Sequence, residues 1–283
     1  MYDKTGVVDL ARRLHALDVD LISSGGTASA IAKAGVPVTD VADITGFPAM
    51  LGHRVVTLHP RIHGGILADR RDPSHLRDLE AHNLDLIDIV VGNLYPFGAD
   101  PSIDLIDIGG PTLLRAAAKN HEYVTVLVDP ADYEPVLKEL ATGGKTTPGL
   151  RLRLARKAFA HTAAYDAAIA GWFNQRTATK DSPLPESIHL SMDKAQDLRY
   201  GENPHQSGAR YRRSGTSSWW DAVVQHSGLD LSYLNIFDAD AAWSLVHDLG
   251  RLSSGSPSAA CAIIKHANPC GAAVAGDLAS AYA

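Results

Sequence analysis

The first 130 residues repeat a pattern in which a helical spacing of apolar residues is followed by a short apolar run. Apolar positions three and four apart predict helices over residues 5–17 and near 27–34. Short apolar runs bounded by Gly, Pro and Asp predict strands. These runs are 19–24, 36–41, 86–97 and 123–128. The alternation predicts an α/β fold with a parallel sheet and helices on both of its faces.

A long helical pattern follows over residues 148–174. Its predicted apolar face comprises Leu152, Ala155, Phe159, Thr162, Ala163, Asp166 and Ile169. Residues 177–187 have the composition of a linker. Beyond them, the apolar segment 187–192, a helix over 238–250 and a strand over 259–265 predict a second α/β unit.

The pattern therefore predicts two domains. The first spans residues 1–176, with a sheet core over about 1–130 and a helical extension over 131–176. The second spans 188–283, after the linker 177–187. We expect the second domain to be incomplete, because its pattern stops at Ala283 without a capping element.

Composition narrows the class of protein. With 45% hydrophobic and 20% charged residues, the 283-residue chain is globular rather than disordered or fibrous. The net charge of −6 argues against nonspecific binding of nucleic acid. No apolar run is long enough to span a bilayer and no signal peptide is visible, so we expect a soluble, cytoplasmic protein without a membrane role. Cys261 and Cys270 lack the spacing of a zinc site, so no metal is expected.

Residues 107–121, DIGGPTLLRAAAKNH, predict a helix with an unusual placement of charge. Pro111 fits a first helical turn, where its missing N–H has no partner in any case. Arg115 and Lys119 share the stripe opposite the apolar face, and like charges four residues apart repel each other. This spacing favours a carboxylate or a bound anion between the two cations. Asp107 is the nearest carboxylate in the sequence.

Ser24, Gly25, Gly26 and Thr27 lie between a predicted strand and a predicted helix. Unpaired backbone N–H groups and the helix dipole make such a junction a site for an anion, and glycine lets a phosphate approach the backbone closely. A plain strand-to-helix turn is the alternative, because the motif matches neither a P-loop nor GxGxxG.

Residues 53–69 concentrate polar donors in a segment that looks too irregular for one helix. The donors are Arg54, Thr57, His59, Arg61 and His63. Loops with this many donors commonly hold a ligand, and a solvated basic loop is the alternative. His59 and His63 have the spacing of a helical zinc pair, but Pro60 and Gly64 argue against a helix here.

Further polar groups follow predicted strands. Asn93 and Tyr95 end the run 86–97, and open α/β sheets bind ligands at the carboxyl ends of their strands. A buried tyrosine bonded to a backbone carbonyl is the alternative for Tyr95. Lys265 and His266 end the strand 259–265, where a cation and a base can act on one substrate. The segment LRYGENPHQ brings together Arg199, Tyr200, Asn203 and His205.

Taken together and in this order, several segments resemble one family. They are SSGGTA, RVVTLHPRIHGGILA, NLYPF, IDIGGPTLLRAAAKNH, LRYGENPHQ and KHANPCG. They are similar to the bifunctional purine-biosynthesis family AICAR formyltransferase/IMP cyclohydrolase. The resemblance implies a methylglyoxal-synthase-like N-terminal domain and a partial cytidine-deaminase-like C-terminal domain. It also implies formyl transfer from 10-formyltetrahydrofolate to AICAR, and dehydrating ring closure of formyl-AICAR to IMP.

The resemblance also implies roles for individual residues. The expected phosphate ligands are Lys4, Ser24, Gly25, Gly26, Thr27 and Arg54. The expected residues at the purine-precursor end of the cyclohydrolase site are Thr57, Asn93, Tyr95, Asp107 and Lys119. Lys119 is expected beside Asp107, so that the pair moves protons during ring closure. The residues expected to bind AICAR and transfer the formyl group are Arg199, Tyr200, Lys265 and His266, the last as the base.

The chain departs from the family pattern in ways that limit these expectations. Val56 stands where the family commonly has lysine. The family's preceding apolar strand and the rest of its transformylase half lie beyond this sequence. We therefore expect a homodimeric IMP cyclohydrolase that binds AICAR, formyl-AICAR and IMP but does not transfer the formyl group. A catalytically impaired nucleotide-binding or regulatory module is the alternative, and a methylglyoxal-synthase-like lyase would leave the residues after 180 unexplained.

Overall fold

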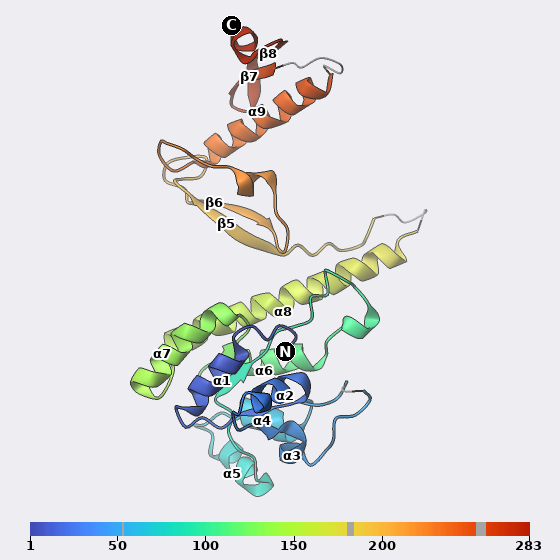
Figure 1. Cartoon of the computed structure of the whole chain (residues 1–283), viewed down its shortest axis with the longest axis vertical. Helices are drawn as coiled ribbons and strands as arrows, with labels where there is room; N and C mark the ends of the chain where they lie inside the picture. Colours follow the sequence, from blue (N-terminus) through green and yellow to red (C-terminus); the bar gives the residue numbers. More distant parts are fainter. Residues whose placement is uncertain (53, 180–183, 253–258) are drawn as a thin grey trace. The chain divides into compact units, whose positions relative to one another are not determined.

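The computed structural model describes residues 1–52, 54–179, 184–252 and 259–283. In this part of the chain the residues form two compact units, Met1–Leu190 (unit 1) and Ser191–Ala283 (unit 2), coloured blue to yellow and yellow to red in Figure 1. The predicted linker 177–187 contains residues 180–183, which lie outside the described residues.

Unit 1 alternates helices with short strands. Its elements are α1 (Val7–His15), β1 (Ile22–Ser23), α2 (Gly25–Lys33), β2 (Thr39–Asp40), α3 (Val41–Thr45), α4 (Pro60–Leu67), α5 (Pro73–His82), β3 (Ile89–Val91), η1 (Ile103–Leu105), α6 (Gly109–Lys119), β4 (Thr125–Leu127), η2 (Pro130–Asp132), α7 (Tyr133–Gly143) and α8 (Pro148–Thr177). β1 pairs with β2 and β3 pairs with β4, both in parallel. This arrangement agrees with the predicted α/β class.

The four predicted strands of unit 1 are present but shorter than their apolar runs. The run 86–97 contributes only Ile89–Val91 to β3. Two residues further on, the side chain of Asn93 bonds to the backbone of Tyr2 and Asp3, and Pro96 has no N–H to donate to a ladder. Among the described residues the strands form two separate pairs rather than one continuous sheet.

The prediction that residues 53–69 are too irregular for a helix is wrong, because α4 lies within them. Pro60 occupies the first turn, where its missing N–H costs nothing. The ring Nδ1 of His59 caps this turn by accepting a backbone N–H at 3.2 Å. Gly65 allows close packing, since a Cβ there would lie 2.3 Å from the backbone oxygen of Asp85. Proline and glycine therefore position this helix instead of preventing it.

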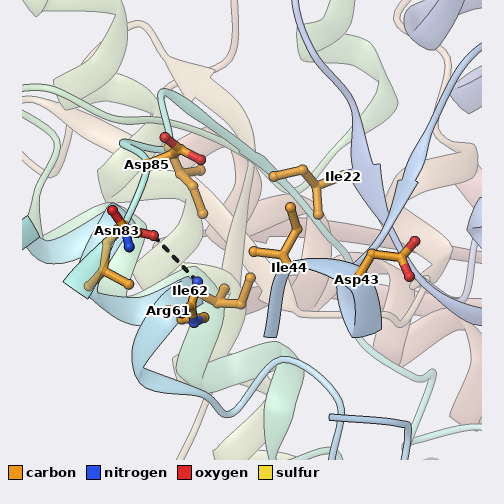
Figure 2. A pocket seen from close by; sticks show the side chains of 9 residues that line it. Ile22, Asp43, Ile44, Arg61, Ile62, Asn83 and Asp85 are labelled. Carbon is orange, nitrogen blue, oxygen red and sulfur yellow. Dashed lines mark hydrogen bonds between the residues drawn. The ribbon is translucent and has the colours of Figure 1, made fainter. Parts of the chain in front are cut away.

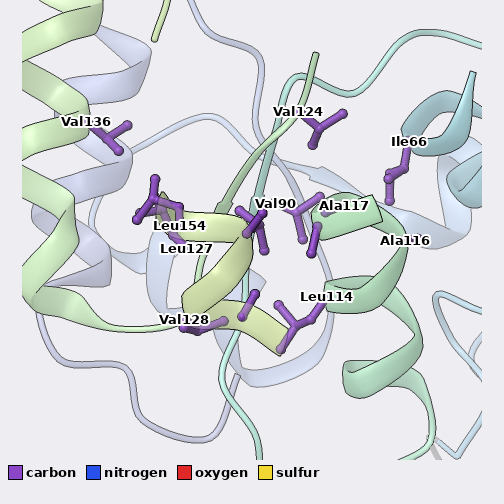
Figure 3. Close-up of a cluster of buried hydrophobic side chains, with 14 of the residues drawn as sticks. Ile66, Val90, Leu114, Ala116, Ala117, Val124, Leu127, Val128, Val136 and Leu154 are labelled. Carbon is purple, nitrogen blue, oxygen red and sulfur yellow. The ribbon is translucent and has the colours of Figure 1, made fainter. Parts of the chain in front are cut away.

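The core of unit 1 forms where α6 packs against α8 and against strands β3 and β4. Ala117 and Ala118 of α6 are 0% and 1% exposed. Figure 3 shows Leu114 and the alanines of α6 grouped with Val90 of β3 and Leu127 of β4. Because alanine side chains are small, the backbone of α6 lies deep in the core, and Thr112, Arg115 and Lys119 on its other stripe are exposed.

α8 buries a face that agrees with the predicted one only in part, since Ala155 and Thr162 are buried as predicted. Leu152 and Phe159, which were predicted to be buried, are 58% and 39% exposed. The buried residues of α8 are Leu150, Leu154, Ala155, Ala158, Thr162 and Tyr165. Apolar residues also occur on the exposed side of this helix, so their spacing alone could not determine which side packs on the core.

Unit 2 consists of β5 (Met192–Leu198), β6 (Gly208–Arg213), η3 (Trp219–Ala222), α9 (Tyr233–Leu252), β7 (Ala259–Lys265), β8 (Asn268–Ala275) and α10 (Leu278–Tyr282). β5 pairs with β6 and β7 with β8, both antiparallel. The predicted strand 259–265 matches β7. α9 packs against β7 and β8 (Figure 1).

The starts of two helices do not follow from the apolar spacing, because capping residues determine them. α5, which the pattern does not predict, begins after Asp72, whose carboxylate accepts a backbone N–H at 2.8 Å, and Pro73 is its first residue. α9 begins at Tyr233 rather than at residue 238. The Ser232 N–H donates to the side-chain oxygen of Asn235 at 3.0 Å, and the Asn235 N–H donates to the Ser232 hydroxyl at 3.3 Å.

A cluster of charges joins η2 to α8 in unit 1. Lys157 of α8 donates to Asp129 at 2.7 Å and to Asp132 at 2.6 Å. Arg153 pairs with Asp132 at 3.1 Å, and the Asp132 side chain is 7% exposed. The pKa of Asp129 is lowered, first by the hydrogen bond from Lys157 and then by a backbone N–H. This cluster fixes the segment after β4 on the long helix.

Lys157→Met should destabilise the chain by about 2 kcal/mol. This is less than the 3–5 kcal/mol typical of a broken buried pair, because the Lys157 side chain is 36% exposed and partly screened by water. An acid whose folded pKa is depressed stabilises the fold above its unfolded pKa and loses that contribution as pH falls. In urea unfolding, the difference in unfolding free energy between Lys157→Met and wild type should therefore decrease below about pH 4. Lys145→Met, at an exposed lysine, is the control; an equal loss there would contradict the prediction.

Candidate functional site

The ammonium group of Lys4 lies over the N-terminus of α2. Its Nζ is 3.8 Å from the position that a Cβ would take on Gly26. Ser24 is the N-cap residue and makes no side-chain cap bond, and Gly25 has a φ of 53°, in the left-handed region that favours glycine. The first N–H groups of a helix have no partner within it. Residues 24–27 therefore combine backbone donors with one nearby cation, as an anion site requires.

Asn93 fixes the segment that carries Lys4. Its Oδ1 accepts the N–H groups of Tyr2 and Asp3 at 2.8 and 3.0 Å, and its Nδ2 donates to the carbonyl of Asp3 at 2.8 Å. The Tyr2 ring also contacts the Tyr95 ring edge-on, with centroids 5.7 Å apart. Asn93 therefore holds this segment in place, and its expected role as a substrate ligand stays a prediction.

The N-terminus of α6 forms a second group of polar atoms. Asp107 Oδ1 accepts the Gly110 N–H at 2.9 Å, and a Cβ on Gly110 would lie 2.3 Å from Asp107 Oδ2, so a larger residue there would displace this carboxylate. The hydroxyl of Thr57 lies 3.5 Å from the Cβ position of Gly109. Tyr165 of α8 supports this turn: its hydroxyl accepts the Asp107 N–H at 2.7 Å and donates to the Leu105 carbonyl at 2.5 Å.

The two helix N-termini border the same space. Burial lowers the pKa of the Met1 amino group; the charge of Lys4 lowers it further, whereas the charge of Asp107 raises it. Two consecutive residues link the two ends: Asn93 bonds to the segment of Lys4, and Leu94 Cδ2 lies 2.9 Å from the position that a Cβ would take on Gly110 of α6. We call this group the carboxyl-edge site, since it follows the ends of β1 and β3. It comprises Lys4, residues 24–27, Thr57, Asn93, Tyr95 and Asp107.

The predicted pairing of Lys119 with Asp107 is wrong within one chain. Asp107 precedes α6 and Lys119 is its last residue. An 11-residue helix is about 16 Å long, which exceeds the reach of a lysine side chain. The Arg115 guanidinium lies over the Phe159 ring of α8, 5.5 Å from its centroid. This contact gives Arg115 a partner on α8, and the anion or carboxylate expected between the two cations stays a prediction.

Two other predicted donors of residues 53–69, Arg54 and His59, have partners within unit 1. Arg54 pairs with Asp104 at 2.5 Å, and both side chains are exposed. His59 is the cap of α4, which uses its Nδ1. Burial lowers the pKa of His63, whose Nε2 has no partner among the described residues. Among all the residues that the structure describes, no group of three or more His, Cys, Asp or Glu could hold a metal ion.

A cavity of about 170 Å³ lies away from the carboxyl-edge site (Figure 2). Its lining includes Ile22, the first residue of β1, and Ile87, which precedes β3. It therefore lies at the opposite ends of these strands. Arg61 lines it too and donates to the carbonyl of Asn83 at 3.4 Å. Figure 2 shows that Ile22, Ile44 and Ile62 contribute apolar walls.

In unit 2, Lys265 and His266 lie at the tight turn of the β7–β8 hairpin. Lys265 pairs with Asn268, so His266 and Ala267 are the two central residues of the turn. Their φ values are 52° and 57°. Positive φ at both central positions is the pattern of a type I′ turn, which prefers Asn-Gly. Each such residue with a Cβ costs about 1–2 kcal/mol, so the turn requires support from its surroundings.

Two contacts support this turn. Asp238 of α9 accepts the Ala267 N–H on its Oδ1 at 2.8 Å. The Asn268 side chain donates to the His266 carbonyl at 2.7 Å. Lys265 and His266 themselves are exposed.

Arg199 and Tyr200 follow β5 and contact the start of α9. The Arg199 guanidinium lies 4.8 Å from the centroid of the Tyr200 ring. The Arg199 N–H donates to the Leu231 carbonyl at 2.9 Å, and the Tyr233 N–H donates to the Tyr200 carbonyl at 3.1 Å. A shallow hollow of about 500 Å³ lies beside them, lined in part by Leu198, Gly201 and Tyr233. The site residues of unit 2 are therefore anchored on one helix.

The sequence gives no functional signal for Tyr165 or Asp238. Tyr165 is not part of the predicted apolar face of 148–174, and Asp238 is only the first residue of the predicted helix 238–250. Their importance depends on hydrogen bonds to backbone far away in the chain, which no local pattern encodes.

Comparisons with known proteins agree with the resemblance seen in the sequence. Residues 117–283 match the family described as AICARFT/IMPCHase bienzyme, and residues 6–121 match the MGS-like domain. The crystal structure of ForH is 40% identical in sequence over 61% of this chain and 95% of the ForH chain, with a TM-score of 0.56. No helix in the described ranges has the length and apolar character needed to cross a membrane. Since the first match covers more than half of its residues, the chain belongs to the AICARFT/IMPCHase bienzyme family and begins with an MGS-like domain.

Proposed function

We propose that unit 1 is an IMP cyclohydrolase that closes the ring of formyl-AICAR at the carboxyl-edge site. The observation that carries this proposal is the placement of Lys4 at the N-terminus of α2 and of Asp107 at the N-terminus of α6, two ends that Asn93 and Leu94 link. A nucleotide needs both ends of such a site. Its 5′-phosphate needs a cation and backbone donors, and its reacting end needs a base.

The chemistry follows from these positions. The phosphate binds Lys4 and the N–H groups of residues 24–27, with Arg54 as a further ligand if it leaves Asp104. At the other end Asp107 accepts a proton from the carboxamide nitrogen, which attacks the formyl carbon. The tetrahedral intermediate then loses water to give IMP. Thr57, Tyr95 and the positive end of the α6 dipole stabilise the oxygen that gains charge.

In unit 2 we assign AICAR binding to Arg199, Tyr200, Lys265 and His266. The family uses a folate cosubstrate, 10-formyltetrahydrofolate, as the formyl donor. His266 would accept the proton of the AICAR amine as that nitrogen bonds to the formyl carbon and the bond from the carbon to the folate nitrogen breaks. Lys265, its neighbour in the chain, would stabilise the negative charge on the formyl oxygen. A homodimer belongs to the same proposal.

One observation favours the alternative, a nucleotide-binding or regulatory module. Val56 packs against the hydrophobic core, and its neighbour Arg54 is paired with Asp104. The segment thus offers few free cations to a substrate. The deciding experiment adds formyl-AICAR to the purified chain and follows the absorbance of IMP. Turnover supports the enzyme, whereas tight binding of formyl-AICAR without IMP formation supports the regulatory module.

The separation of Asp107 and Lys119 generates a kinetic prediction. Asp107→Asn should lower cyclohydrolase turnover by about 10²-fold or more, because it removes the base. Since the two side chains cannot meet in one chain, Lys119→Ala should act independently, with a coupling energy below about 0.5 kcal/mol in a double-mutant cycle. Rates of IMP formation for both single variants and the double variant measure this.

Lys145→Ala is the control for removing an exposed lysine from unit 1. A coupling energy above about 1 kcal/mol would show that Asp107 and Lys119 act on the same substrate. It would require Lys119 to come from a second copy of the chain.

The bonds of Asn93 generate a binding prediction. Asn93→Ala frees the segment that carries Lys4, so it should weaken IMP binding by about tenfold, as expected when one charge-assisted contact is lost. Lys4→Ala should cause a similar loss. The double variant should bind no more weakly than Lys4→Ala alone, because both changes remove the same cation from the site. Isothermal titration calorimetry with IMP measures all three affinities.

Asn174→Ala is the matched control, since Asn174 also donates to a backbone carbonyl, that of Ser187. If the losses from Asn93→Ala and Lys4→Ala multiply, Asn93 contacts the ligand directly and the positioning role is wrong.

A further inference from the structure

α9 contacts both segments of unit 2 to which AICAR binding is assigned. At its first residue, the Tyr233 N–H donates to the Tyr200 carbonyl at 3.1 Å. On the next turn, Asp238 accepts the Ala267 N–H at 2.8 Å. These two anchor residues are separated by roughly 8 Å along the helix axis. The helix therefore sets the spacing between the Arg199–Tyr200 segment and the Lys265–His266 segment.

The hairpin turn needs this contact because its backbone is strained. His266 and Ala267 both have positive φ, and neither is Gly or Asn, the residues that adopt this conformation readily. A strained turn persists only where surrounding contacts determine it. The Ala267 N–H would otherwise point away from the hairpin ladder, since β8 begins at Asn268. The half-buried Asp238 carboxylate gives it a charged acceptor.

We propose that Asp238 is a positioning residue of unit 2: its carboxylate keeps the His266–Ala267 turn closed and so fixes the directions of the Lys265 and His266 side chains. Asp238 touches neither group directly and acts through the backbone of the turn. The expected effect on AICAR affinity rests on the proposed function of unit 2. The structural part concerns the turn itself.

The test uses the full chain with Asp238→Ala, Asp238→Asn and the double variant Asp238→Ala/Ala267→Gly. Asn keeps an acceptor oxygen, and Gly adopts positive φ without strain. Hydrogen–deuterium exchange of segment 263–270 should be at least tenfold faster in Asp238→Ala. The exchange rate of Asp238→Asn should lie within threefold of the wild-type rate. In the double variant the exchange rate should return toward the wild-type rate. AICAR affinity, measured by calorimetry, should follow the same order, with a loss of fivefold or more in Asp238→Ala.

Asp248→Ala is the control, because Asp248 is an exposed carboxylate of the same helix whose partner is Arg251 at 3.7 Å. Unchanged exchange in folded Asp238→Ala, or equal acceleration in the Ala and Asn variants, overturns the proposal. If Asp238→Ala does not fold, the double variant provides the test. A double variant that also fails to fold shows that Asp238 does not offset turn strain. Wild type that binds no AICAR refutes the proposed function of unit 2, and the exchange data still decide the role of Asp238.

Discussion

The packing of α6 is the constraint on which unit 1 depends. Its alanine run is buried against α8, β3 and β4, so the position of the helix follows from this packing. One end of the helix therefore presents Asp107 and Gly110 to the carboxyl-edge site. The other end places Lys119 about 16 Å away. The length of this helix therefore determines which polar residues of one motif can act together.

The carboxyl-edge site is built from contacts distant in the sequence. Asn93 bonds to residues 2 and 3 and so brings Lys4 to the N-terminus of α2. Tyr165 bonds to the backbone at Asp107 and at Leu105. The bonds of Asn93 fix the segment that carries the Lys4 cation, and the bonds of Tyr165 fix the turn that carries the Asp107 carboxylate. Binding and catalysis in this proposal therefore depend on residues that touch no substrate.

Unit 2 uses a comparable principle with a different element. There the strained backbone of His266 and Ala267 is stabilised by Asp238, and α9 also bonds to the segment of Arg199 and Tyr200. Strain at such a turn fixes the direction of side chains that a relaxed loop would leave variable. In both units, hydrogen bonds to backbone groups determine where the exposed polar side chains lie.

The sequence by itself determined the α/β class, the family, the long helix α8, the strand β7 and the position of residues 24–27 at a strand-to-helix junction. These features follow from local periodicity, glycine and proline positions and long motifs. Only the tertiary structure decided that α4 is a helix packed through Gly65, that α8 buries Tyr165 rather than Phe159, and that Asn93 binds its own chain. It also separated Lys119 from Asp107 and joined Asp238 to the Lys265–His266 turn. The reason is physical: a sequence pattern reports which residues share a face or a motif, whereas distances across a helix and bonds between distant segments arise only when the elements pack.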